Sequence, residues 1–142
     1  GKVHYIGISD TPAWIVAQAN TIASFRGWSP FVALQAEYNL LQRAAERDLI
    51  PMAQSLGLAL TPWAALAGGA LTGKYLTGDQ GRITETNQRR NERATEITRG
   101  LVKIAKALGS SPATLAIRWT MQKPLVSIPL VAPEPRPRWW RI

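Results

Sequence analysis

Residues 3–12 read Val-His-Tyr-Ile-Gly-Ile-Ser-Asp-Thr-Pro, and this stretch decides the fold class. Its first seven residues are rich in β-branched and aromatic side chains, which is typical of a buried strand. Thr11 stands where a helix N-cap is expected, and Pro12 suits a first helical turn. The sequence predicts a strand that passes directly into a helix, which ends at Gly27 and buries a stripe of Ile15, Ala19, Ile22 and Phe25.

The same order of strand and helix recurs along the chain. We expect further strands at residues 31–35, 58–63 and 125–131. A turn around Asn39 should precede a second helix that ends before Gly57, and Ser110 or Ser111 with Pro112 should begin a fourth. The expected apolar stripes are Ala45, Leu49, Met52, Ala53 and Leu56 in the second helix, Ile97, Leu101, Ile104, Ala105 and Leu108 in the third, and Leu115 and Trp119 in the fourth.

Strands that alternate with helices indicate an α/β fold of right-handed βαβ units around a parallel sheet. Four parallel strands with flanking helices make half of a (β/α)8 TIM barrel. The alternative is a four-stranded flavodoxin-like sheet, but the Gly-rich phosphate turn of that fold is missing after the first strand, where Gly7 stands alone. We therefore predict a half barrel over residues 1–131, followed by an irregular tail over residues 132–142.

The composition excludes several kinds of site. The 142 residues contain no cysteine and one histidine, so no disulfide, thiolate chemistry or metal site is expected. No apolar run approaches the roughly 20 residues that cross a bilayer, and the first residues do not resemble a signal peptide, so we expect a cytoplasmic protein without membrane contact. The net charge of +8 attracts anions, which include nucleic acids and phosphate-bearing cofactors.

Ligands of parallel barrels lie at the C-terminal ends of the strands. Ser9 and Gln35, at two such ends, can bond a planar amide, and Trp63 offers a face on which a flat ring stacks. Gly68 permits close backbone approach, and Lys74 supplies a charge for a pyrophosphate. Amide, flat ring and phosphate together describe a nicotinamide dinucleotide. The full set predicted at this mouth is Ser9, Asp10, Gln35, Glu37, Tyr38, Trp63 and the segment 66–74.

Other polar residues have simpler interpretations. His4 and Tyr5 lie at the opposite end of the first strand from the expected site, so we assign them no catalytic role. Glu37 is interpreted as a solvated or hydrogen-bonded carboxylate at a strand end. A cluster of basic residues is interpreted as the solvated face of a helix; its members are Arg89, Arg90 and Arg93.

Three motifs carry a family resemblance. They are Gly-Lys-Val-His-Tyr-Ile-Gly-Ile-Ser at residues 1–9, Val-Ala-Leu-Gln-Ala-Glu-Tyr-Asn-Leu-Leu at residues 32–41, and Trp-Ala-Ala-Leu-Ala-Gly-Gly-Ala-Leu-Thr-Gly-Lys-Tyr at residues 63–75. In this order and spacing, residues 1–131 resemble an aldo-keto reductase of the bacterial, potassium-channel-β-subunit-like kind. The resemblance corresponds to strands five to eight of that family's barrel, and it implies an oxidoreductase that uses NADP(H).

The resemblance also implies a set of cofactor-binding residues. The nicotinamide carboxamide would be held by Ser9, Asp10 and Gln35, although the family has an asparagine where Asp10 stands. An aspartate lacks the amide donor and adds a negative charge, so weaker binding is expected unless Asp10 turns away to cap the helix. Trp63 would stack on the nicotinamide, with Ala64 beside it. The pyrophosphate loop would contribute Leu66, Gly68 and Lys74, and Arg82 would face the cofactor.

The resemblance brings no catalytic residue with it. The family's catalytic aspartate, tyrosine, lysine and histidine lie on its first four strands, which this chain does not resemble, so carbonyl reduction by this chain alone is not expected. The family's adenosine-phosphate helix is replaced by Pro133-Glu-Pro-Arg-Pro-Arg-Trp-Trp-Arg-Ile, whose prolines forbid a helix. Binding of NADP(H) is therefore expected to be weak or lost.

A half barrel leaves its inner face and two strand edges uncovered. We expect a homodimer in which two copies complete the barrel. The alternative function is a non-catalytic basic module that binds an acidic partner or nucleic acid through its charge and its Pro-Arg-Trp tail. Nucleic acid is not the expected partner, because the sequence offers no recognition helix or aromatic groove.

Overall fold

A computed structural model describes residues 2–79, 81, 83, 84 and 86–131. In this part of the chain, three strands form the sheet, namely β1 (Ile6–Ser9), β2 (Phe31–Glu37) and β3 (Ala59–Trp63). The α-helices are α1 (Ala13–Arg26), α2 (Leu49–Ser55), α3 (Glu92–Ala107) and α4 (Pro112–Met121). Short 3-10 helices lie at Ala44–Glu46, Ala67–Thr72, Lys74–Leu76 and Gln88–Arg90. Arg82 and the predicted tail over residues 132–142 lie outside the described residues.

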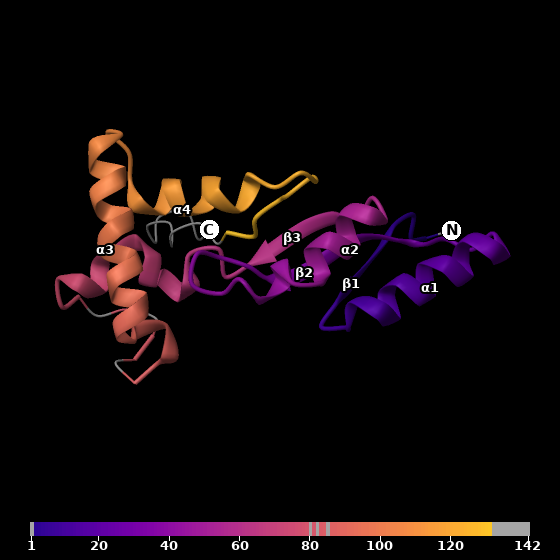
Figure 1. Cartoon of the computed structure of the whole chain (residues 1–142), viewed down its shortest axis with the longest axis horizontal. Coiled ribbons are helices and arrows are strands. Elements are labelled where there is room, and N and C mark those ends of the chain that lie inside the picture. Colours follow the sequence, from indigo (N-terminus) through magenta and orange to yellow (C-terminus); the bar gives the residue numbers. More distant parts are fainter. Residues whose placement is uncertain (1, 80, 82, 85, 132–142) are drawn as a thin grey trace, which may run out of the picture.

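The sheet is parallel, and its strands follow the chain order β1-β2-β3. Helices α1 and α2 form the crossovers between these strands, as in βαβ units, and the sheet lies between α1 at one end and α3 at the other (Figure 1). A flavodoxin-like sheet reverses its strand order beside the first strand. The consecutive order therefore favours the wall of a barrel over that alternative.

The predicted fourth strand is only partly formed. Ser127 makes a single parallel bridge to Leu60, and the N–H groups of Ile128 and Leu130 donate to carbonyls of β3 at 2.8 Å. Segment 126–130 thus lies along the edge of β3 where a fourth strand was expected. The prediction of four full strands was wrong, because the carbonyl acceptor on β3 for Leu130 belongs to Pro62, which has no N–H to continue the ladder.

The hydrophobic core lies on one face of the sheet. Successive side chains of a strand point to opposite faces, and Leu34, Ala36 and Leu60 are buried on the face that α1 and α2 cover. The residues between them point to the other face, which the described helices leave accessible; Gln35 is exposed there. Helices on one face and an open second face are what a part of a barrel wall requires.

Helix α1 packs with a face other than the predicted one. The predicted Ile22 and Phe25 are exposed, Phe25 by 88%, and the buried residues are Ala13, Val16, Asn20 and Ala23. Asn20 explains this rotation, because its side-chain amide donates to the carbonyl of Phe31 at 3.0 Å and accepts from the N–H of Phe31 at 2.9 Å. The helix is thereby fixed to the first residue of β2, and its larger apolar side chains point outward.

The second predicted helix is interrupted. Its first residues form the 3-10 helix Ala44–Glu46, and α2 begins only after Asp48, whose carboxylate accepts from the N–H of Leu49. Ile50 and Ala53 are the buried residues of α2, whereas the predicted Leu56 is exposed. The turn expected at Asn39 is confirmed. The side-chain oxygen of Asn39 accepts from two backbone N–H groups, those of Leu41 and Gln42.

Helices α3 and α4 begin with side-chain caps. Ser111 accepts from the N–H of Thr114 at 3.0 Å, so the predicted start of α4 at Ser111 and Pro112 is confirmed. Of the stripe predicted for α3, Ile104 is 55% exposed and Leu108, which follows the helix, is 65% exposed; the buried residues of α3 are Ala94, Thr98, Leu101 and Ala105. Leu101 and Ala105 belong to both the predicted and the observed stripe, and Leu101 packs in one cluster with Ala67, Ala70 and Leu71 of the segment Ala67–Thr72.

Candidate cofactor site

The strand register brings three predicted site residues to one face of the sheet. Ser9 pairs with Gln35, and Gln35 pairs with Thr61, so these three side chains form a row. Trp63 lies two residues beyond Thr61 and shares its face, opposite Glu37. Thr61 was not predicted from the sequence. It lies two residues before Trp63 on the same strand, and this spacing alone places both side chains on one face of the sheet.

This row remains accessible. Ser9 and Trp63 are partly exposed, and Gln35 is exposed. A shallow cavity of about 320 Å³ is lined by Ser9, Gln35 and Thr61 together with Gly7, Ile8 and Ala33. Gln35 and Trp63 also line a neighbouring cavity of about 350 Å³, to which Asp10 contributes. A flat polar ring therefore has access to an amide, two hydroxyl groups and an indole on the same surface.

Asp10 does not cap the following helix. Its backbone is left-handed, with φ +49°, a conformation that aspartate and asparagine tolerate better than most residues. The N-cap position of α1 is Pro12, which makes no side-chain hydrogen bond, and Thr11 donates its hydroxyl to the carbonyl of Ser9 at 2.9 Å. The prediction that Thr11 caps α1 was wrong, because the preceding turn already uses its hydroxyl. Asp10 itself is exposed beside the row.

The segment after β3 forms a larger cavity. It has a volume of about 800 Å³ and is lined by Ala64, Ala65, Leu66, Gly68, Gly69, Thr72, Lys74, Pro129, Leu130 and Val131. The predicted residues Ala64, Leu66, Gly68 and Lys74 thus lie around one space next to Trp63. The cavity combines several backbone groups of a tight turn with one ammonium group, a combination suited to an anion.

Glycine is required at two places in this segment. Gly68 and Gly69 have φ of +68° and +95°, values that residues with a side chain adopt only with strain. A β-carbon at Gly68 would also lie 2.8 Å from a methyl carbon of Ile83. The predicted segment 66–74 lies in two 3-10 helices, Ala67–Thr72 and Lys74–Leu76, and its turns depend on these glycines.

Tyr75 fixes the position of Lys74. The hydroxyl of Tyr75 donates to the carbonyl of Gly68 at 3.4 Å and accepts from the N–H of Ile83 at 3.2 Å. The ammonium nitrogen of Lys74 lies 5.1 Å from the centre of the Tyr75 ring, within the range of a cation–π contact. Lys74 makes no ion pair within the described residues. Its charge is held beside the cavity by a neutral partner.

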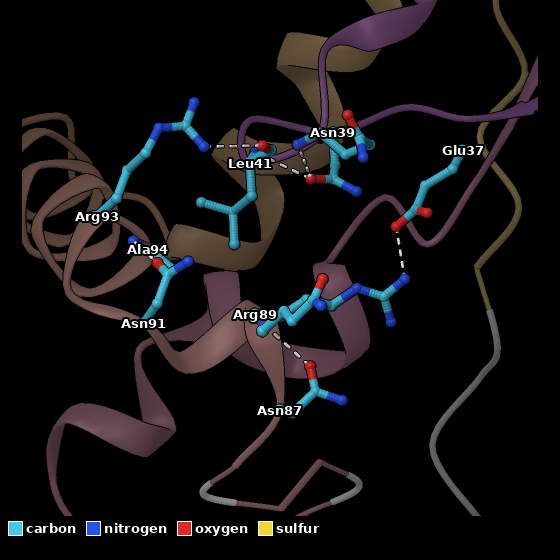
Figure 2. Close-up of a pocket in the computed structure, with 10 residues that line it drawn as sticks. Glu37, Asn39, Leu41, Asn87, Arg89, Asn91, Arg93 and Ala94 are labelled. Atoms are coloured by element: carbon cyan, nitrogen blue, oxygen red, sulfur yellow. Dashed lines mark hydrogen bonds and ion pairs between the residues drawn. The ribbon is translucent and has the colours of Figure 1, made fainter.

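The basic cluster was only partly understood from the sequence. Arg89 donates to the carboxylate of Glu37 at the end of β2, and Arg93 donates to the carbonyl of Leu41 at 3.2 Å (Figure 2). The guanidinium carbon of Arg90 lies 4.7 Å from the centre of the Tyr75 ring. The interpretation of these arginines as a solvated helix face was wrong for Arg89, which is half-buried in a 3-10 helix. The interpretation of Glu37 as a hydrogen-bonded carboxylate is confirmed.

Tyr38 points away from the mouth where it was predicted. Its side chain is buried on the helical face, stacks on Trp119 with ring centres 5.1 Å apart, and donates to Glu46 at 2.5 Å. Burial, reinforced by Glu46, raises the pKa of Tyr38 above its ordinary value. The hydrogen bonds of Arg43 lower the pKa of Glu46 from 4.5 to about 2, with help from Tyr38 and Lys123. This cluster joins β2 to the end of α4 and is structural.

Two kinds of feature are missing from the described part of the chain. It contains no group of three or more side chains that could hold a metal ion. Its helices include none of the length and apolar character needed to cross a membrane.

A parallel sheet in sequential strand order, with helices on one face and polar residues at the C-terminal ends of its strands, is typical of a part of a β/α barrel. The sequence model of the Aldo/keto reductase family matches residues 1–136 of this chain. The chain belongs to this family, as the three motifs predicted.

The chain is similar to several named oxidoreductases. It is 37% identical over 138 residues to a probable aryl-alcohol dehydrogenase of Saccharomyces cerevisiae, covering 92% of this chain and 42% of that protein. It is 37% identical over 140 residues to an aryl-alcohol dehydrogenase of Phanerodontia chrysosporium whose name specifies NADP(+), covering 92% and 36%. An uncharacterized oxidoreductase of Bacillus subtilis is 34% identical over 134 residues, covering 94% and 41%. The chain spans between 33% and 48% of the length of such relatives.

Proposed function

We propose that this chain is the cofactor-holding part of an aldo-keto reductase barrel and that it binds NADP(H). The observation that carries the proposal is the register that aligns Ser9 with Gln35 on one open face, with Trp63 on the next strand along. A relative named for NADP(+) supports the choice of cofactor.

Each residue of the row has a role in this proposal. Ser9 and Gln35 bond the carboxamide of the nicotinamide, and Thr61 adds a third polar group to the same row. Trp63 presents its indole to the nicotinamide ring. The cavity formed by residues 64–74 receives the pyrophosphate, with backbone approach at Gly68 and the positive charge of Lys74. Ala64 and Leu66 complete its wall.

The redox chemistry needs more than this row. When bound, the cofactor supplies the hydride that is exchanged with a carbonyl carbon. The proton must come from an acid–base residue, and we propose that none of the residues at this mouth provides it. His4 and Tyr5 precede β1, at the end of the sheet opposite the row, and Tyr5 is 80% exposed. Carbonyl reduction is therefore proposed to require residues beyond these 142.

Calorimetric titration of the chain with NADPH tests the proposal. We expect saturable binding that Lys74→Gln weakens by about tenfold, since hydrogen bonds to charged groups contribute about 1.5–3 kcal/mol. Gln35 is exposed, so Gln35→Ala should weaken binding without disturbing the fold. Trp63→Ala should weaken it further, and Trp14→Ala is the matched control because Trp14 is 68% exposed on α1. Absence of binding to a folded chain would refute the proposal, and salt-sensitive retention of DNA instead would favour the basic interaction module.

We further propose that two copies of the chain associate through their open sheet edges. Tyr5 before β1 is 80% exposed, and Val126 and Ile128 at the other edge are 66% and 55% exposed. Two parallel half barrels can pair both edges at once around a two-fold axis along the barrel, which leaves no edge open. Sedimentation velocity at micromolar concentration should report a dimer, and a monomeric mass would contradict this proposal. The cytoplasmic location stays a prediction.

A further inference from the structure

A fourth cavity opens on the other side of the segment 64–74. It has a volume of about 450 Å³ and lies between the end of β2 and the start of α3 (Figure 2). Its wall is polar, with Leu41 and Ala94 as the apolar contributors; the remaining lining residues are Glu37, Asn39, Gln42, Asn87, Gln88, Asn91, Arg89 and Arg93. Two guanidinium groups and one carboxylate give this wall a net positive charge.

Most side-chain acceptors of the wall are already used by the protein itself. The amide oxygens of Asn39 and Gln42 accept from backbone N–H groups that follow β2. Asn87 accepts from the N–H of Arg89, and Asn91 accepts from the N–H of Ala94 at the start of α3. The wall has five amide side chains, and in four of them the oxygen is therefore turned toward the backbone.

The donors of the same wall are not used to the same extent. An amide whose oxygen is fixed to the backbone keeps its NH2 group for another acceptor. Within the described residues, the NH2 groups of Asn87, Asn91 and Gln42 make no hydrogen bond. Arg93 uses one of its five N–H groups, on the carbonyl of Leu41, and Arg89 uses one nitrogen on Glu37. Donors outnumber acceptors on a positively charged surface.

We infer that this cavity binds a small polar organic anion, recognised through a carboxylate or phosphate group. Oxyanions accept several hydrogen bonds and carry the charge that guanidinium groups favour. The volume lies in the range of metabolite sites, so the anion has a body larger than an inorganic ion. The scarcity of apolar wall indicates that this body is polar.

The anion site is separate from the proposed cofactor cavity. The two cavities share no lining residue. The wall between them is held by Asn39, whose amide donates to the carbonyl of Ala64 at 3.1 Å. Arg89 also lies against this wall: one of its guanidinium nitrogens would be 3.7 Å from a β-carbon placed on Gly68. A ligand of the anion site therefore contacts Asn39 and Arg89, two residues that lie against the loop that the proposed function assigns to the pyrophosphate.

Amide NMR spectra of the chain without cofactor test this inference. Inorganic phosphate and malonate are the two probes, and each is titrated at constant ionic strength. We expect saturable shifts of the side-chain NH2 signals of Asn87, Asn91 and Gln42. The tighter probe identifies the group that the natural ligand carries. Shifts centred on the segment 64–74 would overturn the inference, as would an absence of saturation. Because NADPH is absent, the outcome is independent of the proposed function.

Two substitutions at the wall should change affinity in opposite directions. Arg93→Gln removes an exposed donor and should weaken binding by roughly tenfold. Glu37→Gln removes the one carboxylate and releases Arg89, so it should strengthen binding by a few-fold. Arg118→Gln on α4 is the matched control, since Arg118 is exposed and does not line the cavity. Equal losses in Arg93→Gln and Arg118→Gln would show a nonspecific charge effect and overturn the inference. A Glu37→Gln variant that binds phosphate more weakly would also contradict it.

Discussion

Replacing Glu46 by glutamine should destabilise the chain near neutral pH and have little effect in strong acid. Glu46 accepts from Arg43 at 2.7 Å, from Lys123 at 2.9 Å and from buried Tyr38 at 2.5 Å. The carboxylate is thus the only acceptor shared by three donors from three segments of the chain that the structure describes. Glutamine keeps one oxygen and turns an NH2 group toward donors that need an acceptor.

The pKa of Glu46 sets the size of this effect. A fall from 4.5 to about 2 corresponds to about 3 kcal/mol of preferential stabilisation of the charged form in the folded state. Arg43 is 54% exposed, so solvent screens part of this interaction, and we expect a loss of about 1–2 kcal/mol in the free energy of unfolding. The cation–π contacts of Lys123 and Arg43 are not removed by this substitution, because the rings of Tyr38 and Trp119 remain in place.

The sign of the pH dependence follows from the direction of the shift. A lowered pKa in the folded state contributes stability above pH 4.5, the ordinary value, and this contribution disappears as the pH falls toward 2. Urea unfolding followed by circular dichroism at several pH values should therefore show the largest difference between wild type and Glu46→Gln near pH 7. Glu96→Gln, at an exposed position of α3, is the control. An equal difference at pH 7 and pH 2 would refute the electrostatic reasoning.

Three further outcomes follow from the described contacts. Asn20→Ala should lower the free energy of unfolding by about 2 kcal/mol, measured by urea unfolding, because two bonds to the start of β2 are lost. Gly68→Ala should lower the free energy of unfolding by about 2–3 kcal/mol and weaken NADPH binding, since backbone strain at φ +68° adds to a 2.8 Å contact between the new β-carbon and Ile83. The control is Gly109→Ala, at φ +61° in open space, which should lower the free energy of unfolding by about 1 kcal/mol and leave NADPH binding unchanged. Asp10→Asn should tighten NADPH binding several-fold in calorimetry by restoring an amide donor beside the row, and unchanged affinity would exclude Asp10 from the site.

The alternation of strands and helices could be predicted because it depends on local signals. The run before Ser9, the glycines that follow α1 and α2, and Ser111 with Pro112 each act over a few residues. The three strands of the sheet therefore lie where the sequence indicated, with shifts of one to three residues at their ends, whereas the expected fourth strand forms only a single bridge and the second helix begins later than expected. The family was also predictable, since three motifs in the right order exclude most coincidental matches.

The packing face of a helix could not be predicted in the same way. Helix α1 has apolar side chains on both sides, and a polar residue, Asn20, decides which side faces the sheet. No periodicity rule would place an asparagine in the core, because the reason is a backbone group eleven residues later. The proposed anion cavity between β2 and α3 was hidden for a similar reason. Arg89 meets Glu37 across 52 positions of sequence, so only the fold brings the ends of the ion pair together.

The strand β2 separates the residues that stabilise the fold from those that bind. Leu34 and Ala36 point into the core, and Gln35 and Glu37, their neighbours in sequence, point to the open face. A core formed on one face with α1 and α2 does not need the open face to be filled. Side chains there can consequently be selected for a ligand at little cost to the stability of the sheet. For the same reason, a loss of NADPH affinity in Gln35→Ala without a change in unfolding reports on binding alone.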